Sequence, residues 1–282
     1  MRILIVGNRG MLGTELMKAF APVDTTTGLD VAELDITEPG QCDARVRELQ
    51  PEVILNAAAL TAVDYCELHE EEAFRVNAQG AGNLAAAAAS TGALIVHYST
   101  DYVFDGGRPE PYCEEDPTGP RSAYGRSKLR GEEMVRSFRT EHLILRTAWL
   151  FGCHGKNFIR TVLQAARGHQ PLRVVDDQRG SPTYARDLAA CTVKLVGAGS
   201  RGTYHVTNSG ACSWYELAHF SVEYSGITEV TVSPVSSSEY RRPAPRPANS
   251  VLVNSRLQRE GFGLLRSWQD AVREYIYECE KF

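Results

Sequence analysis

The chain has 282 residues, which is enough to bury a full hydrophobic core in one large domain or in two smaller ones. Its 43% hydrophobic and 23% charged residues are typical of a globular protein, and its net charge of -5 gives no reason to expect nucleic acid or an anionic membrane as a partner. No apolar run approaches the roughly 20 residues that a membrane span needs, and Gly7 cuts the first run too short for a signal peptide.

The cysteines bear on the compartment in which the protein works. Seven are scattered along the chain, and no two have Cys-x-x-Cys spacing: Cys42, Cys66, Cys113, Cys153, Cys191, Cys212 and Cys279. An odd number without metal-ligand spacing predicts reduced thiols in a cytoplasmic protein, with neither a disulfide framework nor a zinc site.

The first predicted element is a buried strand followed by a nucleotide-binding turn. Residues 3–6 form a continuous apolar run of the kind that fills the middle of a parallel sheet. Gly7, Gly10 and Gly13 follow in the pattern Gly-x-x-Gly-x-x-Gly, before a helix-compatible segment at residues 14–20. Glycines let the backbone approach a pyrophosphate, and the free N–H groups and dipole of a helix favour the anion. The pattern also fits a plain strand-to-helix turn, but its place after an N-terminal strand favours a dinucleotide site.

A second strand is predicted for residues 24–29, with Asp30 at its end. This position lies roughly 20 residues beyond the glycines, where a carboxylate can accept hydrogen bonds from the adenosine ribose, a contact that favours NADH. Asp30 fits a loop residue equally well, and Arg9 in the glycine turn could instead receive the 2′-phosphate of NADPH. The sequence therefore predicts NADPH or NADH as cofactor without choosing between them.

Small residues follow the third predicted strand. A helix begins at Pro39 and runs to about residue 49, and the strand at 53–55 ends in Asn56 and three alanines. Small side chains at this edge leave room for a flat ligand, and this is the edge at which open α/β sheets bind ligands. The same alanines would also be found if close packing simply left no room for larger side chains. The predicted cofactor contacts are Gly7, Gly10, Met11, Leu12, Gly13, Asp30, Asp35, Ile36, Ala57, Ala58, Ala59, Tyr124 and Lys128.

The catalytic prediction rests on a fourth strand and the helix after it. The strand at 93–96 leads to Thr100, and a helix runs from Tyr124 to about residue 138. Tyr124 and Lys128 are four residues apart, so the phenol and the ammonium point the same way. A nearby cation favours phenolate, so we expect Lys128 to lower the pKa of Tyr124 toward neutrality and Thr100 to bind the same substrate oxygen. Such pairs also occur by chance on solvated helices.

Alternation of strands and helices predicts the fold. A further strand at 142–146 completes a Rossmann-like, doubly wound parallel sheet over residues 1–152. Residues 153–282 are predicted to form mainly a smaller α/β substrate-binding lobe, with some segments returning to the first domain. Other predicted features are a helix at 67–91 carrying Asn77 as a site contact or a surface residue, helices at 156–168, 187–196, 214–224 and from 267, strands at 172–175 and 202–206, a polar turn at 177–183, and a surface loop at 233–250.

Several motifs share a likeness to one family. They are Gly7-x-x-Gly10-x-x-Gly13, Asn56-Ala57-Ala58, Ser99-Thr100-Asp101-Tyr102-Val103-Phe104, Tyr124-x-x-x-Lys128, Arg146-Thr147-x-Trp149, Asp177-Gln178-x-Gly180-x-Pro182-Thr183 and Arg246-Pro247-x-Asn249-Ser250. Together they resemble the extended short-chain dehydrogenase/reductases and, more narrowly, the dTDP-4-dehydrorhamnose reductase family. The likeness spans nearly the whole chain.

The resemblance implies that NAD(P)H reduces the C4 ketone of dTDP-6-deoxy-L-lyxo-4-hexulose to give dTDP-L-rhamnose. Tyr124 would give the proton, Lys128 would hold the nicotinamide ribose, and Thr100 would orient the ketone. The implied substrate contacts are Val63, Asp64, Tyr102, Phe104, Trp149 and Arg246. Arg246 suits a diphosphate because guanidinium binds phosphate bidentately, and Tyr102 and Trp149 could flank a sugar ring.

The resemblance also raises a metal and two other functions. Glu15 matches a Mg²⁺ ligand at the dimer interface of some family members. The corresponding positions near Arg186 and Gln269 are not carboxylates, although Asp187 and Asp270 are adjacent, so we predict no metal and a monomer or homodimer. An epimerase or dehydratase on the same scaffold stays open. So does a non-catalytic NADP-binding subunit similar to the regulatory subunit of methionine adenosyltransferase, although an intact Thr100, Tyr124 and Lys128 argues against it.

Overall fold

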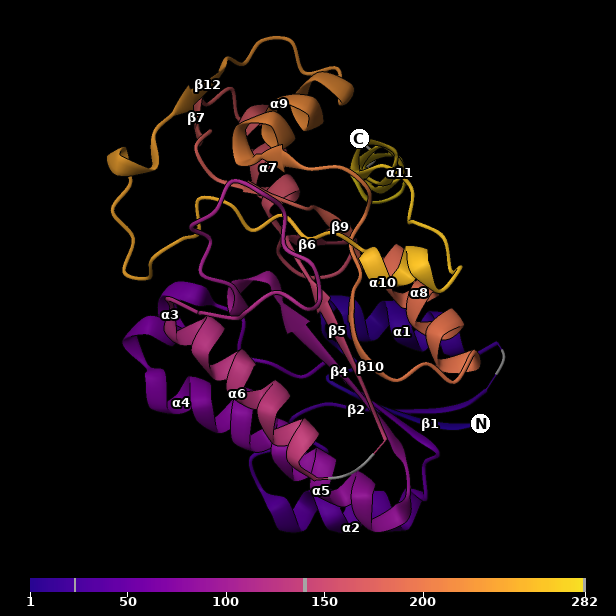
Figure 1. Ribbon diagram of the computed structural model, residues 1–282. Coiled ribbons are helices and arrows are strands. Elements are labelled where there is room, and N and C mark those ends of the chain that lie inside the picture. Colours follow the sequence, from indigo (N-terminus) through magenta and orange to yellow (C-terminus); the bar gives the residue numbers. More distant parts are fainter. Residues whose placement is uncertain (23, 139–140, 281–282) are drawn as a thin grey trace.

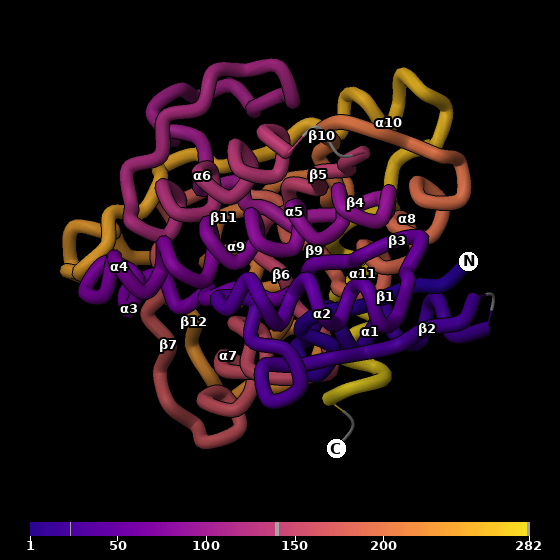
Figure 2. The backbone as a smooth tube through the Cα atoms, turned by 90° about the horizontal axis from the view of Figure 1, so that it is seen from below, coloured from indigo at the N-terminus to yellow at the C-terminus, as the bar shows by residue number. Residues whose placement is uncertain are grey.

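A six-stranded parallel sheet forms the centre of the molecule. The computed structural model describes residues 1–22, 24–138 and 141–280. The strands lie in the order β10-β5-β4-β3-β1-β2, and each neighbouring pair is parallel (Figure 2). Their bounds are β1 Arg2–Val6, β2 Thr25–Leu29, β3 Val53–Asn56, β4 Leu94–Thr100, β5 His142–Thr147 and β10 Gly202–His205. The predicted doubly wound sheet is confirmed.

Helices cover both faces of this sheet (Figure 1). Successive side chains of a strand point to opposite faces, so Ile3 and Ile5 join the core beneath α1 and α8, whereas Leu4 and Val6 join the core beneath α2, α5 and α6. The helix bounds are α1 Met11–Phe20, α2 Pro39–Leu49, α5 Ala81–Thr91, α6 Ala123–Ser137 and α8 Ala185–Gly197. Burial on both faces explains why the first strand reads as an unbroken apolar run.

The segment between β3 and β4 differs from the single helix predicted for residues 67–91. It is divided into α3 Val63–Leu68, α4 Glu70–Phe74, a π-helical turn η1 Arg75–Gly80, and α5. The π turn holds Asn77, which is buried and not a surface residue. Its amide accepts from the Leu60 N–H and donates to the Leu60 carbonyl and to Ser127 on α6. Through Asn77, the π turn therefore connects the loop after β3 to α6, the helix that carries Tyr124.

The second half of the chain is divided between the sheet and a separate core. Strand β10 is an edge strand of the sheet, and helix α8 packs on one face of it. Helix α10 Ser255–Arg259, which was not predicted, packs beside β10. The rest surrounds the buried rings of Phe151, Tyr184 and Tyr275. Its elements are β6 Leu150–Phe151, α7 Phe158–Arg167, β7 Leu172–Val175, β8 Arg179–Gly180, β9 Thr183–Tyr184, β11 Cys212–Ser213, α9 Trp214–Tyr224, β12 Val232–Val235, η3 Ser237–Glu239 and α11 Trp268–Cys279. Its helices α7, α9 and α11 lie in the upper part of Figure 1. The domain boundary near residue 152 stays a prediction.

Two segments predicted as turn and loop contain short strands. The polar turn at 177–183 includes β8 and β9, which pair with β11 and β6. The expected surface loop at 233–250 begins as β12, parallel to β7. A strand of two to four residues is too short to show an alternation of apolar and polar residues. Its extended conformation is therefore decided by the strand with which it pairs and could not be predicted from the sequence. Ser213 and Glu216 form a capping box at the start of α9, and one face of α11 is buried.

One cysteine prediction was wrong. Cys153 and Cys279 form a disulfide, with their Cα atoms 5.2 Å apart, whereas the sequence predicted seven reduced thiols. The two cysteines are 126 residues apart in the chain, and no spacing rule links residues at that distance. The pairing arises because the C-terminal end of α11 packs beside the loop after β6. The other five cysteines are free thiols.

Among the residues that the structure describes, no helix is both long enough and apolar enough to cross a membrane.

A buried ion pair joins α6 to the sheet. The guanidinium of Arg146 on β5 donates to both carboxylate oxygens of Glu132 on α6, at 2.9 Å and 2.8 Å. Both side chains are almost fully buried, and Arg136 adds a third donor at 2.9 Å. Burial opposes ionisation of Glu132, but the hydrogen bonds from Arg146 outweigh it and hold the pKa of this carboxyl below its ordinary value. The ion pair therefore fixes the position of α6 relative to β5 of the sheet.

We predict that Glu132→Gln lowers the free energy of unfolding by about 3–5 kcal/mol, because it leaves the Arg146 charge buried without a counter-charge. The pKa of Glu132 is depressed in the folded state, so its contribution is present above the ordinary carboxyl pKa and is lost as the pH falls through the folded pKa. Urea denaturation at pH 7 measures the difference.

Glu133→Gln is the matched control, since its pair with Arg130 is exposed and worth about 0.5 kcal/mol or less. Equal stability of the two variants would contradict a structural role for the buried pair.

Candidate active site

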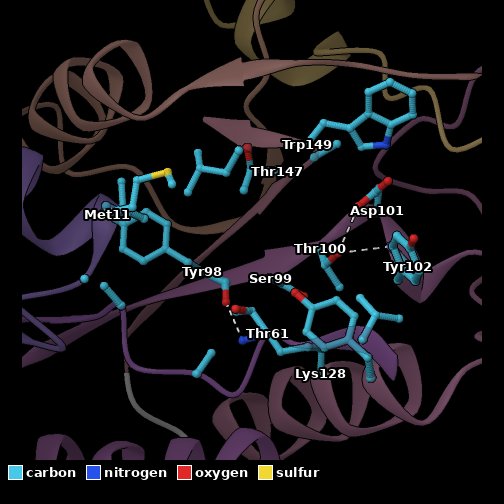
Figure 3. A pocket seen from close by; sticks show the side chains of 18 of the residues that line it. Met11, Thr61, Tyr98, Ser99, Thr100, Asp101, Tyr102, Lys128, Thr147 and Trp149 are labelled. Atoms are coloured by element: carbon cyan, nitrogen blue, oxygen red, sulfur yellow. Dashed lines mark hydrogen bonds between the residues drawn. The ribbon is translucent and has the colours of Figure 1, made fainter. Parts of the chain in front are cut away.

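A cavity of about 540 Å³ opens at the carboxyl ends of the central strands (Figure 3). This is the edge at which open α/β sheets bind ligands. The loops after β3, β4 and β5, the start of α1 and the start of α6 all contribute to its wall. Its wall includes all three predicted catalytic residues, Thr100, Tyr124 and Lys128. Residues from these five parts of the sequence therefore meet in one place.

The start of α6 places the phenol and the amine. Ser122 caps the helix by accepting from the Gly125 N–H at 3.1 Å, so Tyr124 lies in the first turn and Lys128 one turn later, both facing the cavity. A Cβ atom on Gly125 would come within 2.2 Å of the Tyr102 carbonyl oxygen. The absence of a side chain at this position is what lets α6 pack against the end of β4.

Lys128 is held away from bulk water. Its side chain is 2% exposed, and its Nζ donates to the Tyr98 carbonyl oxygen at 2.7 Å (Figure 3). Nζ also lies 3.3 Å from Nε2 of His97. Burial lowers the pKa of Lys128 to about 8, although the charge of Glu132 acts in the opposite direction. The amine therefore changes protonation state just above neutral pH.

The predicted lowering of the Tyr124 pKa is wrong for this structure. Burial raises the pKa of the phenol above its ordinary value, while contact with Thr100 acts in the opposite direction. The Lys128 amine is directed to the Tyr98 carbonyl, and its own charge is destabilised by the same burial. A helical spacing of four residues thus brought the two groups to one cavity but did not make the lysine a strong electrostatic partner of the phenol.

The end of β4 adds a second acid that the sequence reasoning did not assign. The Thr100 hydroxyl donates to Asp101 Oδ1 at 2.9 Å and accepts from the Tyr102 N–H at 3.2 Å (Figure 3). Burial raises the pKa of Asp101 to about 6. The ring of Tyr102 meets the ring of Tyr124 edge to face, with centroids 5.6 Å apart. The motif itself contained Asp101, but no spacing rule marked its carboxyl as part of the cavity wall.

The glycine turn and β2 line a second cavity of about 550 Å³. Gly7 has a φ of +81°, and a Cβ atom on it would lie 2.7 Å from the Ala58 nitrogen, so only glycine fits here. The two cavities share Gly10 and residues 57–59, so they meet at this turn. Open backbone at the N-terminus of α1 between two adjoining cavities suits a dinucleotide whose pyrophosphate lies at the turn.

The predicted cofactor contacts divide between the two cavities. The first is lined by Gly10, Met11, Leu12, Ala57, Ala58, Ala59, Tyr124 and Lys128. Those found only in the second are Gly7, Asp30, Asp35 and Ile36, whereas Gly13 is buried in α1 and lines neither. Asp30 Oδ2 accepts from the Arg9 N–H at 3.0 Å, and the Arg9 guanidinium pairs with Glu33. Whether Asp30 or Arg9 selects the dinucleotide stays a prediction.

Three of the six predicted substrate contacts line the first cavity: Val63, Tyr102 and Trp149. Trp149 has a φ of +47° and its ring stacks on Trp214 at 3.5 Å between centroids. Trp214 and the exposed Lys156 also line the cavity. Neither was predicted, because a tryptophan at the start of a helix and a lone lysine in a loop carry no sequence signal.

The other three predicted substrate contacts lie outside this wall. Asp64 accepts from the Ala244 N–H at 3.2 Å and pairs with Arg246 at 3.0 Å. Phe104 stacks on Tyr112 in a small core, with ring centroids 4.4 Å apart. Two residues predicted to bind the substrate thus bind each other, and they fasten the segment around residue 244 to α3.

The carboxylate considered for a metal is already held by cations of the protein. Glu15 is 3% exposed, and its oxygens lie 2.9 Å from Lys18 and 3.7 Å from Arg186. Within the described ranges, one group of three potential metal ligands is close enough to share an ion, namely Cys153, Glu278 and Cys279. Its two sulfur atoms are bonded to each other, which leaves one carboxylate. A hard cation needs several oxygen ligands, so this group does not fit one.

Comparison with known proteins adds to this geometry. The model of the family described as "RmlD substrate binding domain" matches residues 1–281. A dTDP-4-dehydrorhamnose reductase of Burkholderia thailandensis is 42% identical over 289 residues, covering 96% of this chain and 97% of that protein. The crystal structure of a dTDP-4-dehydrorhamnose reductase from Clostridium acetobutylicum has a TM-score of 0.97 and 42% identity, with 100% of both chains covered. That of Bacillus anthracis, in complex with NADP, has a TM-score of 0.96 and 38% identity, covering 98% of this chain and 99% of that chain.

We predict that Gly125→Ala destabilises the fold by about 1–3 kcal/mol, because the new methyl group must displace α6 or the Tyr102 carbonyl. The matched control is Gly40→Ala in α2, where a Cβ atom has no neighbour within 4 Å, and there alanine is expected to stabilise the helix by up to about 1 kcal/mol. Chemical denaturation distinguishes them. A Gly125→Ala protein as stable as Gly40→Ala would show that α6 is not held in this close contact.

Proposed function

The chain belongs to the family described as the RmlD substrate binding domain, and on that basis we propose that it is an NAD(P)H-dependent reductase of a dTDP-4-keto-6-deoxy sugar. The proposed reaction is reduction of the C4 ketone of dTDP-6-deoxy-L-lyxo-4-hexulose to dTDP-L-rhamnose. One observation supports it above the others: the glycine turn and the Tyr124–Lys128 pair open into the same cavity. A dinucleotide at the turn and a proton donor on α6 would then reach one substrate atom.

The dinucleotide, when bound, supplies a hydride to the ketone carbon. Negative charge grows on the ketone oxygen, so a group that can give up a proton must lie beside it. Tyr124 fits this task, because burial keeps its phenol protonated at neutral pH. An alkoxide is a stronger base than a phenolate, so transfer of the phenolic proton to the oxygen is favourable. A charged Lys128 would stabilise the phenolate that remains.

Neighbouring side chains suit the orientation of the substrate. Thr100 presents its hydroxyl beside Tyr124 and would bind the same ketone by turning its hydrogen from Asp101 to the ketone oxygen. Tyr102 and the stacked Trp149 offer aromatic faces to the sugar ring. For the diphosphate, Lys156 on the cavity wall is a further cation, whereas Arg246 would have to exchange its pairing with Asp64 for one with phosphate.

A spectrophotometric assay at 340 nm with the dTDP-4-keto sugar and each dinucleotide tests this function. The expected result is oxidation of the dinucleotide in equal amount to the product. An epimerase or dehydratase would recycle its dinucleotide and give no net oxidation, and a binding subunit would give no turnover at all.

Tyr124→Phe is expected to lower turnover by about 10²–10⁴-fold, the usual contribution of a general acid, and to leave dinucleotide affinity unchanged. Tyr275→Phe is the control, because its phenol is also buried but lies in the second core, bonded to Asn157 and Glu280. Steady-state kinetics and a dinucleotide titration are the measurements. Near-wild-type turnover in Tyr124→Phe would remove this residue from the proton-donor role.

Asp30→Ser is expected to lower the ratio of kcat/KM for NADH over NADPH by about tenfold or more, since it removes both an acceptor for ribose hydroxyls and a charge that repels a 2′-phosphate. Asp30 lines the second cavity. Asp43→Ser, on the exposed face of α2, is the control. If both variants keep the wild-type ratio, Asp30 does not select the dinucleotide.

A further inference from the structure

His97 is a buried histidine next to the active-site lysine. It lies on β4 directly opposite Asn56 of β3 and is completely buried, with its Nδ1 3.2 Å from the Asn56 amide nitrogen. Its Nε2 is 3.3 Å from the Lys128 amine, on the side where α6 passes. Burial, followed by the charges of Lys128 and Arg136, holds the pKa of His97 well below 6.5. The imidazole is therefore neutral, and only one of its nitrogens carries a hydrogen.

The neighbours of His97 decide which nitrogen that is. The Ala58 N–H can only donate, and Asn56 Oδ1 accepts from it at 3.2 Å. The amide NH₂ of Asn56 is therefore the group that faces His97 Nδ1, and it donates there. Nδ1 must accept, so the hydrogen of the neutral ring lies on Nε2. Nε2–H then points at Lys128.

An ammonium and an Nε2–H cannot both donate across this contact. A neutral amine has a lone pair that accepts from Nε2–H while one of its own hydrogens goes to the Tyr98 carbonyl. We propose that His97 is a positioning residue for Lys128: a one-way chain of hydrogen bonds from the Ala58 N–H through Asn56 to the imidazole presents a donor to the amine and favours its neutral form. The chain begins at the loop where the two cavities meet.

Other charges near the amine do not cancel this effect. Glu132, on α6, favours the ammonium, but its carboxylate is shared by Arg146 from β5 and Arg136 from α6. The remaining titratable groups on the cavity wall are Tyr98, Asp101, Tyr102, Tyr124 and Lys156. Burial raises the pKa of Tyr98, Tyr102 and Tyr124, so these phenols stay neutral near pH 7. The donor on His97 is therefore the nearest side-chain group that favours the neutral form of Lys128.

The first test reads the tautomer in the wild-type protein. In long-range ¹H–¹⁵N spectra of protein with ¹⁵N-labelled histidine, we expect His97 to show the pattern of the Nε2–H tautomer. Its ring signals are assigned to residue 97 through their correlation with its own Cβ. His205 is an internal control, because its Nδ1 faces the Val253 carbonyl at 3.1 Å and must carry the hydrogen there. An Nδ1–H or a charged ring at His97 overturns the proposal. This readout needs no substrate and no variant.

The second test reverses the chain. In Asn56→Asp the carboxylate accepts from both the Ala58 N–H and the imidazole, so His97 is expected to change to the Nδ1–H tautomer in the same spectra. A ring that keeps its Nε2–H form shows that Asn56 does not set the tautomer, which also overturns the proposal.

The third test measures Lys128 and rests on the proposed reductase function. In His97→Gln the side-chain carbonyl can turn to the ammonium, so the alkaline limb of kcat/KM, which reports the free enzyme, should move to higher pH by about one to two units. His205→Gln, which removes a buried histidine elsewhere, should leave the limb in place. If the alkaline limb of kcat/KM lies at the same pH in His97→Gln as in the wild type, the proposal is overturned. A protein that is inactive with every keto sugar refutes the proposed function instead, and the two tautomer tests still decide the role of His97.

Discussion

The buried pair of Glu132 and Arg146 is the interaction on which the site depends. It connects α6, which supplies Tyr124 and Lys128, to β5 of the sheet, whose neighbour β4 supplies Thr100. A carboxylate without exposure to water is tolerated only with a counter-charge and with its lone pairs satisfied, and two arginines meet this condition. The geometry of the pair is bidentate, so it restricts both the distance and the rotation of α6. A helix placed this way keeps its first turn against the strand ends.

Burial also governs the electrostatics of the cavity. It raises the pKa of Tyr124 and of Asp101, and it lowers the pKa of Lys128 to about 8. All three shifts favour the neutral form of the group, because low dielectric penalises charge of either sign. Tyr124 therefore keeps its proton near pH 7, whereas Asp101 and Lys128, with pKa values of about 6 and about 8, change protonation state close to neutral pH. The charge that develops during ketone reduction would then be met by the phenolic proton of Tyr124 and by Lys128 in its charged form.

The two halves of the chain have different tasks around this cavity. The sheet and α6 supply every residue predicted to act on the ketone, while the loop before β6 and the start of α9 add the stacked pair of Trp149 and Trp214. Asp64 pairs with Arg246 across the two halves, whereas the bond between Cys153 and Cys279 lies within the second half. The disulfide anchors the loop that continues to Lys156 on the cavity wall. Two residues first assigned to the substrate, Asp64 and Arg246, thus serve to connect the two halves.

Local patterns in the sequence determined a large part of this molecule. The apolar run before Gly7, the helix start at Pro39 and the spacing of Tyr124 and Lys128 each follow from the conformation of a few adjacent residues, and all three hold in the structure. Tertiary structure alone decided the π turn that buries Asn77, the pairing of Asp64 with Arg246, and the place of His97 between Asn56 and Lys128. It also decided the pKa of Tyr124, which a helical spacing suggested would fall and which burial raises. Periodicity and capping act within a few residues, whereas burial and long-range pairing depend on which distant segments the folded chain brings together.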